Sequence, residues 1–280
     1  MTSDRPLEFS LAYLTVIGTP PLRMVEIASD AGYDYVSVRF NRVTADEAEF
    51  PYLTDPSLIR HFNRKLRETG VRVLDAELIR LGPDDDPADF ERFVEVAAAI
   101  GARHLIIQLP DPNRARAAEK LAAICSMAAP YGMTVDLEFI PWTATPDLDA
   151  AADIVGRVSH PAAGILVDTL HFERSGSSLS QLHQLSPKLF HFVQLCDAPR
   201  EAPRDDEGLI RAARTARTIP GQGGLDLRPV VEALPRVPYS LEVPNEVTRK
   251  DIGTCEFAKR LLVATKEFLA LSEERISVLN

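Results

Sequence analysis

The segment that decides the fold is GILVDTLHFERSG, residues 164–176. A short run of apolar and small residues leads to Asp168, and His171 follows three positions later. The run then changes to the polar letters ERSG. A buried strand that ends in a carboxylate, with an imidazole just beyond it, is typical of an α/β protein whose chemistry lies at the carboxyl ends of its strands.

Seven similar apolar or β-branched runs surround this one, and Ala-rich amphipathic segments separate them. The eight predicted strands are 7–14, 35–40, 71–78, 104–109, 134–139, 164–169, 189–195 and 239–244. Regular alternation of strands and helices predicts a parallel sheet. At 280 residues we predict an α/β fold: a closed (β/α)8 TIM barrel that forms a single domain over residues 1–280. An open doubly wound sheet is the alternative, but no GxGxxG follows the first strand.

Composition excludes several classes of partner. The formal net charge is −10, from 41 Asp and Glu against 31 Lys and Arg. This balance disfavours nucleic acid and membrane surfaces, which need clustered positive charge. The three cysteines form no CxxC pair, and the chain shows neither a signal peptide nor an apolar run near the roughly 20 residues that span a bilayer. We therefore expect a cytoplasmic protein that binds a small molecule.

Four predicted strands carry an oxygen donor at their carboxyl ends. These donors are Glu138, Asp168, Gln194 and Glu242. Their neighbours in sequence are mostly apolar, so alternation turns the four side chains toward the barrel axis. Carboxylates this close cannot all ionise without a cation, and an all-oxygen set favours Mn²⁺ or Mg²⁺ over Co²⁺ or Zn²⁺. The sequence predicts one divalent metal site.

The same residues predict a chemistry. A metal that chelates an α-hydroxyketone stabilises the enediolate and makes the α-hydrogen more acidic. Glu138 and Glu242 are placed to flank the substrate, one removing the proton and the other returning it. Epimerisation, ketose–aldose isomerisation and dehydration can all follow from that intermediate, so the outcome stays open.

The motif order resembles the xylose-isomerase-like TIM barrels, a group with tagatose/psicose epimerases, inosose-processing enzymes and 3-dehydroshikimate dehydratases. The matching motifs are LEF at Glu138, VDTLH at 167–171, VQLCD at 193–197, RTIPGQGG at 217–224 and LEVP at Glu242. The resemblance implies that Glu138, Asp168, Gln194 and Glu242 hold the metal. It also implies that His171 binds a substrate oxygen and that Arg217 steadies an enolate or a substrate anion. Many members have His in place of Gln194.

Other polar and aromatic residues are candidates for substrate binding. Glu77 and Gln108 lie near the ends of their strands, Trp142 could form an apolar wall, and Asp197 could orient Gln194 or bind substrate. His104 and His191 are interpreted as structural, because His104 opens its strand and alternation turns His191 toward the helices.

The leading hypothesis is a divalent-metal-dependent isomerase or epimerase of a sugar-like α-hydroxyketone, a polyol or keto-sugar with or without phosphate. The alternative is a lyase of the 3-dehydroshikimate dehydratase kind, which Gln194 and the VQLCD context favour. An apurinic endonuclease is disfavoured, because such enzymes need a His-rich three-metal cluster. A non-catalytic binding barrel stays open, and a homo-oligomer agrees with the resemblance.

Overall fold

The computed structural model describes residues 6–43 and 47–279 and is a closed barrel of eight parallel strands in sequence order. The first strand pairs with both the second and the eighth, which closes the barrel. This confirms the predicted fold class. The strands are β1 (Phe9–Leu11), β2 (Tyr35–Arg39), β3 (Arg72–Arg80), β4 (His104–Gln108), β5 (Thr134–Glu138), β6 (Ala163–Asp168), β7 (Val193–Leu195) and β8 (Tyr239–Leu241).

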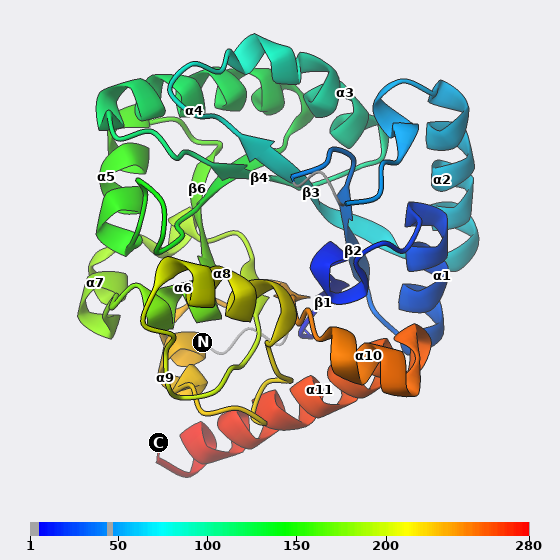
Figure 1. Cartoon of the computed structure of the whole chain (residues 1–280), viewed down its shortest axis with the longest axis vertical. Helices are drawn as coiled ribbons and strands as arrows, with labels where there is room; N and C mark the ends of the chain where they lie inside the picture. Colours follow the sequence, from blue (N-terminus) through cyan, green and yellow to red (C-terminus); the bar gives the residue numbers. More distant parts are fainter. Residues whose placement is uncertain (1–5, 44–46, 280) are drawn as a thin grey trace.

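Helices form a ring outside the strands (Figure 1). The α-helices are α1 (Pro21–Ala31), α2 (Pro56–Thr69), α3 (Glu91–Ala99), α4 (Arg114–Ala128), α5 (Leu148–Val158), α6 (Thr169–Arg174), α7 (Leu179–Gln184), α8 (Asp206–Thr215), α9 (Leu227–Ala233), α10 (Glu246–Ile252) and α11 (Thr254–Leu279). Single 3-10 turns are η1 (Tyr13–Val16), η2 (Pro51–Leu53), η3 (Pro87–Phe90), η4 (Ala129–Tyr131) and η5 (Pro187–Leu189). The long helix α11 runs along one side of the molecule and packs against α1.

Capping residues fix where several helices begin and end. Asp55 accepts a hydrogen bond from the Ser57 N–H at the start of α2, and Asn113 accepts two from the first turn of α4. Such caps satisfy N–H groups that have no partner within the helix. Gly70 ends α2 in the left-handed conformation at φ 74°, which costs a glycine little. The chain therefore turns sharply from each helix into the next strand.

Apolar side chains form two layers. The larger layer fills the space between the strands and the surrounding helices. A smaller cluster lies separately and consists of Tyr35, Leu74, Leu78, Ile106, Leu166 and Phe192. Ile106 and Leu166 come two residues before polar residues at the ends of β4 and β6, on the same face of their strands. The small cluster thus lies beneath the mouth formed by the strands' carboxyl ends.

One detail differs from the sequence-based expectation. The strand predicted over 189–195 begins as β7 only at Val193, and the segment before it includes the turn η5. The polar segment 198–224 contains the helix α8, whose start is capped by Asp205. No helix in the described ranges combines the length and apolarity needed to cross a bilayer.

Candidate active site

The four predicted donors gather at the carboxyl ends of β5 to β8. Glu138 and Asp168 are the last residues of β5 and β6, Gln194 lies within β7, and Glu242 directly follows β8. Asp168 is in register with Gln194, and the Gln194 Nε2 atom donates to Glu242 Oε1 at 3.0 Å. All four side chains are nearly excluded from solvent, with at most 6% exposure. Strand alternation therefore turns all four inward, as predicted.

Asp168 also starts a helix, which places His171 in the site. Its Oδ1 accepts hydrogen bonds from the N–H groups of Leu170 at 2.8 Å and His171 at 3.2 Å, so the carboxylate caps α6. The His171 Nε2 atom lies 4.0 Å from Glu138 Oε1, and its Nδ1 is buried without a hydrogen-bond partner. Burial lowers the pKa of His171 to about 4, so its ring is neutral at pH 7.

Arg217 joins two of the four donors. Its Nη1 donates to Asp168 Oδ2 at 2.5 Å and its Nη2 pairs with Glu242 Oε2 at 3.0 Å. The Nε donates to the Ala213 carbonyl in α8, which fixes the plane of the guanidinium. Arg217 is only 2% exposed. The guanidinium of Arg217 therefore lies between the carboxylates of Asp168 and Glu242.

The carboxylate of Glu138 accepts a hydrogen bond from an amide side chain and not from a cationic one. Gln108 Nε2 donates to Glu138 Oε2 at 2.5 Å, and Gln108 Oε1 accepts from Nε and Nη2 of Arg80. Burial, reinforced by the nearby charge of Asp168, raises the pKa of Glu138 to about 7. The carboxyl can therefore gain and lose a proton near neutral pH.

The mouth of the barrel has an excess of negative charge. Four buried carboxylates, Glu77, Glu138, Asp168 and Glu242, meet two buried guanidinium groups, those of Arg39 and Arg217, and Arg39 also pairs with Glu47. Protons or a divalent cation must balance the excess negative charge.

The pKa directions show how the protein balances this charge with protons. Burial raises the pKa of Glu242 well above its usual range, although Arg217 opposes the shift. Burial acts on Asp168 as well, but the charge of Arg217 and the hydrogen bonds that Asp168 accepts from Arg217 and from the His171 N–H together outweigh it and lower the pKa of Asp168. Glu138 and Glu242 are therefore the carboxyls that take up protons when no cation is bound.

The donor set fits a divalent cation. Gln194 Oε1 is buried without a hydrogen-bond partner, and Glu138, Asp168 and His171 each offer a donor atom within 4.8 Å of the others. Arg217 also binds oxygens of Asp168 and Glu242, so a cation must share these two carboxylates with the guanidinium or displace it. Oxygen donors and surplus negative charge are what hard divalent ions prefer.

A cavity of about 540 Å³ opens above the donors. Its wall includes Arg39, Gln108 and Trp142, which contact Glu77, Glu138 and His171 respectively. The Trp142 ring meets His171 edge to face, with centroids 5.2 Å apart. The predicted apolar wall is therefore present, whereas the four donors lie one layer below the cavity surface.

Glu77, a predicted substrate ligand, is instead fully engaged with protein groups. Its Oε2 pairs with Arg39 Nη2 at 2.5 Å and its Oε1 lies 2.9 Å from Ser37 Oγ, which also lies 2.5 Å from Asp75 Oδ1. One hydroxyl proton cannot serve two carboxylates, so one acid must carry a proton. Burial raises the pKa of Asp75 well above its usual range, which identifies Asp75 as that acid. Sequence reasoning missed Ser37 and Asp75, although alternation along 35–40 and 71–78 turns both inward.

The carboxylate of Asp197 binds the backbone of a turn, not the side chain of Gln194. Its carboxylate accepts hydrogen bonds from the N–H groups of Gly221, Gly223, Leu225 and Ala198. A side chain at Gly223 would come within 3.0 Å of this carboxylate, so the turn requires glycine there. The hydrogen bonds of Gln194 go to Glu242 instead. Among the described contacts, Asp197 therefore positions the PGQGG segment beside Arg217 and does not orient Gln194.

Comparison with known proteins identifies the family of the chain. The profile of the xylose isomerase-like TIM barrel family matches residues 25–261. The chain belongs to this family. Inosose isomerase of Bacillus velezensis is 25% identical over 246 residues, which cover 81% of this chain and 83% of that protein.

Two further similarities involve other members of the group. A 3-dehydroshikimate dehydratase of Pseudomonas putida is 31% identical over 98 residues, which span 34% of this chain and 15% of that protein. The crystal structure of the IolI protein with a bound zinc atom superposes with a TM-score of 0.74 at 21% identity, covering 95% of this chain and 98% of that one. The latter likeness shows that the two proteins share a fold.

Proposed function

We propose that this protein is a divalent-metal-dependent isomerase or epimerase that acts on a sugar-like α-hydroxyketone. The observation that carries the proposal is the pair Glu138 and Glu242, two buried carboxyls with raised pKa values on strands β5 and β8 of one barrel mouth. Two carboxyls that both bind and release protons are what a proton transfer between neighbouring carbons needs. The similarity to inosose isomerases supports a cyclic polyol ketone as substrate.

Glu138, Asp168, Gln194 and Glu242 would hold the metal, which is Mn²⁺ or Mg²⁺ by the chemistry of its donors. When bound, the metal polarises the substrate carbonyl and its neighbouring hydroxyl and so makes the α-hydrogen more acidic. The zinc atom in the related IolI crystal structure supports a divalent ion at this mouth.

The protein side chains supply the proton transfers. Glu138 removes the α-proton, and Glu242 returns a proton from the β8 side. His171 is neutral and has an unpaired Nδ1, so it can hydrogen-bond a substrate oxygen without adding charge. Trp142 closes the apolar side of the cavity and limits access of water.

The proposal predicts exchange of the α-hydrogen with solvent. We expect inosose or a keto-hexose in D₂O to gain deuterium beside the carbonyl when the protein is supplied with Mn²⁺ or Mg²⁺. Removal of metal by a chelator should lower the exchange rate at least 100-fold, and added metal should restore it. Proton NMR of the substrate measures the exchange. Exchange that is equally fast without metal would contradict the proposal.

One observation favours a lyase of the 3-dehydroshikimate dehydratase kind as a second candidate. Arg80 and Arg214 both line the cavity, and neither pairs with a carboxylate among the described residues. Burial lowers the pKa of Arg80; the nearby charge of Glu138 opposes this shift, and the charge of Arg214 adds to it. Cations left unpaired in a substrate cavity are suited to an anionic ligand, and 3-dehydroshikimate carries a carboxylate.

The two candidate functions predict different changes in KM when these two arginines are replaced. We expect the double variant Arg80→Ala/Arg214→Ala to raise KM for 3-dehydroshikimate about tenfold or more, because it removes charge-assisted hydrogen bonds. KM for an uncharged inosose should change by less than about threefold. The absorbance of the conjugated aromatic product and NMR of the inosose report the two reactions. Arg211→Ala is the matched control, since Arg211 lies on the same helix as Arg214 and pairs with Glu207. Equal changes for both substrates would exclude an anion site at these arginines.

A further inference from the structure

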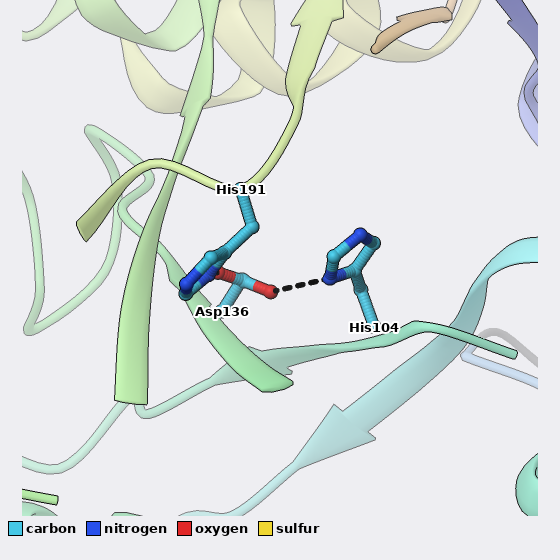
Figure 2. Close-up of side chains that lie close together, drawn as sticks. All are labelled: His104, Asp136 and His191. Atoms are coloured by element: carbon cyan, nitrogen blue, oxygen red, sulfur yellow. Dashed lines mark hydrogen bonds and ion pairs between the residues drawn. The ribbon is translucent and has the colours of Figure 1, made fainter. Parts of the chain in front are cut away.

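A second group of ligand-type side chains lies near the amino ends of the strands, away from the proposed active site. His104 begins β4, Asp136 lies in the middle of β5, and His191 precedes β7. Figure 2 shows the Asp136 carboxylate next to the rings of both histidines. Each of the three residues offers one donor atom, and these atoms lie within 4.8 Å of one another. We call this group the lower cluster.

His191 faces the barrel rather than the helices, contrary to the expectation from alternation. It precedes the first paired residue of β7, so strand alternation does not fix its direction. Its Nδ1 lies 2.6 Å from Asp136 Oδ1. Strand β6 runs between β5 and β7, and Gly164 on β6 is in register with Asp136. A side chain at Gly164 would come within 3.0 Å of both groups, so glycine is what lets them meet.

The lower cluster is oriented by neighbouring groups. Thr134 Oγ1 donates to Asp136 Oδ2 at 2.7 Å and lies 2.7 Å from His104 Nδ1. The two imidazole rings are nearly parallel, at 15° with centroids 5.8 Å apart, and His104 stacks on Phe192 of the interior apolar cluster. Because Thr134 Oγ1 gives its proton to Asp136, His104 Nδ1 donates to Thr134 in the metal-free protein, and a bound ion would displace that proton.

Histidine is the partner of Asp136 in the metal-free protein. Asp136 is fully buried, and in the described ranges no Lys or Arg pairs with it, whereas His191 Nδ1 lies 2.6 Å from its Oδ1. A bound ion would take the place of the proton between His191 and Asp136. The side chains of His104 and His191 are 12% and 20% exposed, which gives an ion a path from solvent.

The separations are near those of a coordinated ion. Asp136 Oδ2 lies 3.7 Å from His104 Nδ1, and Asp136 Oδ1 lies 2.6 Å from His191 Nδ1. Donors about 2.0–2.1 Å from a tetrahedral zinc ion stand roughly 3.3 Å from one another. Movements of about 1 Å therefore suffice to bring the three donors to such spacing.

We propose that His104, Asp136 and His191 form a second metal site that takes Zn²⁺ or a similar nitrogen-preferring divalent ion and links β4, β5 and the segment before β7. Two imidazoles and one carboxylate select zinc, cobalt or nickel, whereas the all-oxygen mouth selects harder ions. The interior apolar cluster lies between the two sites, so they need not share a cavity or an ion.

The test counts the ions bound by a variant in which the proposed metal site at the barrel mouth is disabled. The background variant Glu138→Gln/Asp168→Asn replaces two carboxylates at the barrel mouth by amides of the same shape. Equilibrium dialysis against Zn²⁺, followed by elemental analysis, should find one ion per chain in this background. Adding His191→Ala or His104→Gln should weaken that binding at least tenfold, whereas His183→Ala, an exposed histidine on α7, should leave it unchanged. No ion in the background, or binding that survives both cluster substitutions, would overturn the proposal.

A second measurement needs no change in the lower cluster and so does not depend on whether those variants fold. Cu²⁺ bound to the same background should show the spin-echo modulation of two imidazole nitrogens in pulsed electron paramagnetic resonance. Modulation from fewer than two would overturn the proposal. Neither experiment measures catalysis, so a failed lower site and a failed isomerase assignment give different results.

Discussion

The variant Glu138→Gln is expected to lower kcat for the proton transfer by about 10²–10⁴-fold, the usual contribution of a general acid or base. The amide keeps the size of the side chain and can still accept the hydrogen bond from Gln108, but it cannot take a proton. Deuterium exchange at the substrate α-carbon should fall by the same factor. Steady-state kinetics and NMR exchange, both with metal present, measure the two effects.

The matched control is Glu173→Gln, the same chemical change on helix α6 at a partly buried carboxyl outside the donor set. It should leave kcat within about twofold. Metal content of the Glu138→Gln protein must be measured as well, since lost metal would also slow the reaction. A Glu138→Gln protein with bound metal and unchanged exchange would rule out Glu138 as the base and would shift that role to Glu242.

The variant Arg217→Met is expected to lower the free energy of unfolding of the metal-free protein by about 3–5 kcal/mol, the usual cost of removing one partner of a buried ion pair. Arg217 pairs with both Asp168 and Glu242, and its loss leaves the buried Asp168 carboxylate without this cationic partner. Denaturant unfolding in the presence of a chelator measures the change.

The exposed pair Arg157 and Asp153 on α5 provides the comparison, with the Arg157 side chain 51% exposed. Arg157→Met should cost less than about 1 kcal/mol, as is usual for surface ion pairs. If Arg217→Met destabilises the protein no more than Arg157→Met does, then protons on Asp168 and Glu242 replace the guanidinium at little cost.

Sequence patterns predicted most of the barrel because each pattern reports on a local constraint. Apolar runs with period two and helix-ending glycines such as Gly70 and Gly132 reflect backbone geometry that neighbouring residues set. The inward direction of Glu138, Asp168, Gln194 and Glu242 follows from the same alternation. Capping of α6 by Asp168 is also local, and it brings His171 to the mouth.

Predictions were weaker where a residue lies outside a regular strand. His191 points into the barrel because β7 begins only at Val193. Asp197 binds the N–H groups of a turn more than twenty residues away in sequence, so no nearby pattern reveals its partner. Ser37 and Asp75 gain significance only because β2 and β3 pair and bring them together.

The sequence by itself determined the family of the chain, the closed parallel barrel and the set of oxygen donors at its mouth, because strand period and strand-end residue types are properties of short segments. Only the tertiary structure decided which charges are paired. Arg217 reaches Asp168 across 49 residues of sequence, and Arg80 and Arg214 both line the cavity, where neither pairs with a carboxylate of the described residues. Ion pairing depends on distances of a few ångströms between segments far apart in the chain, and such distances are set only when the barrel closes.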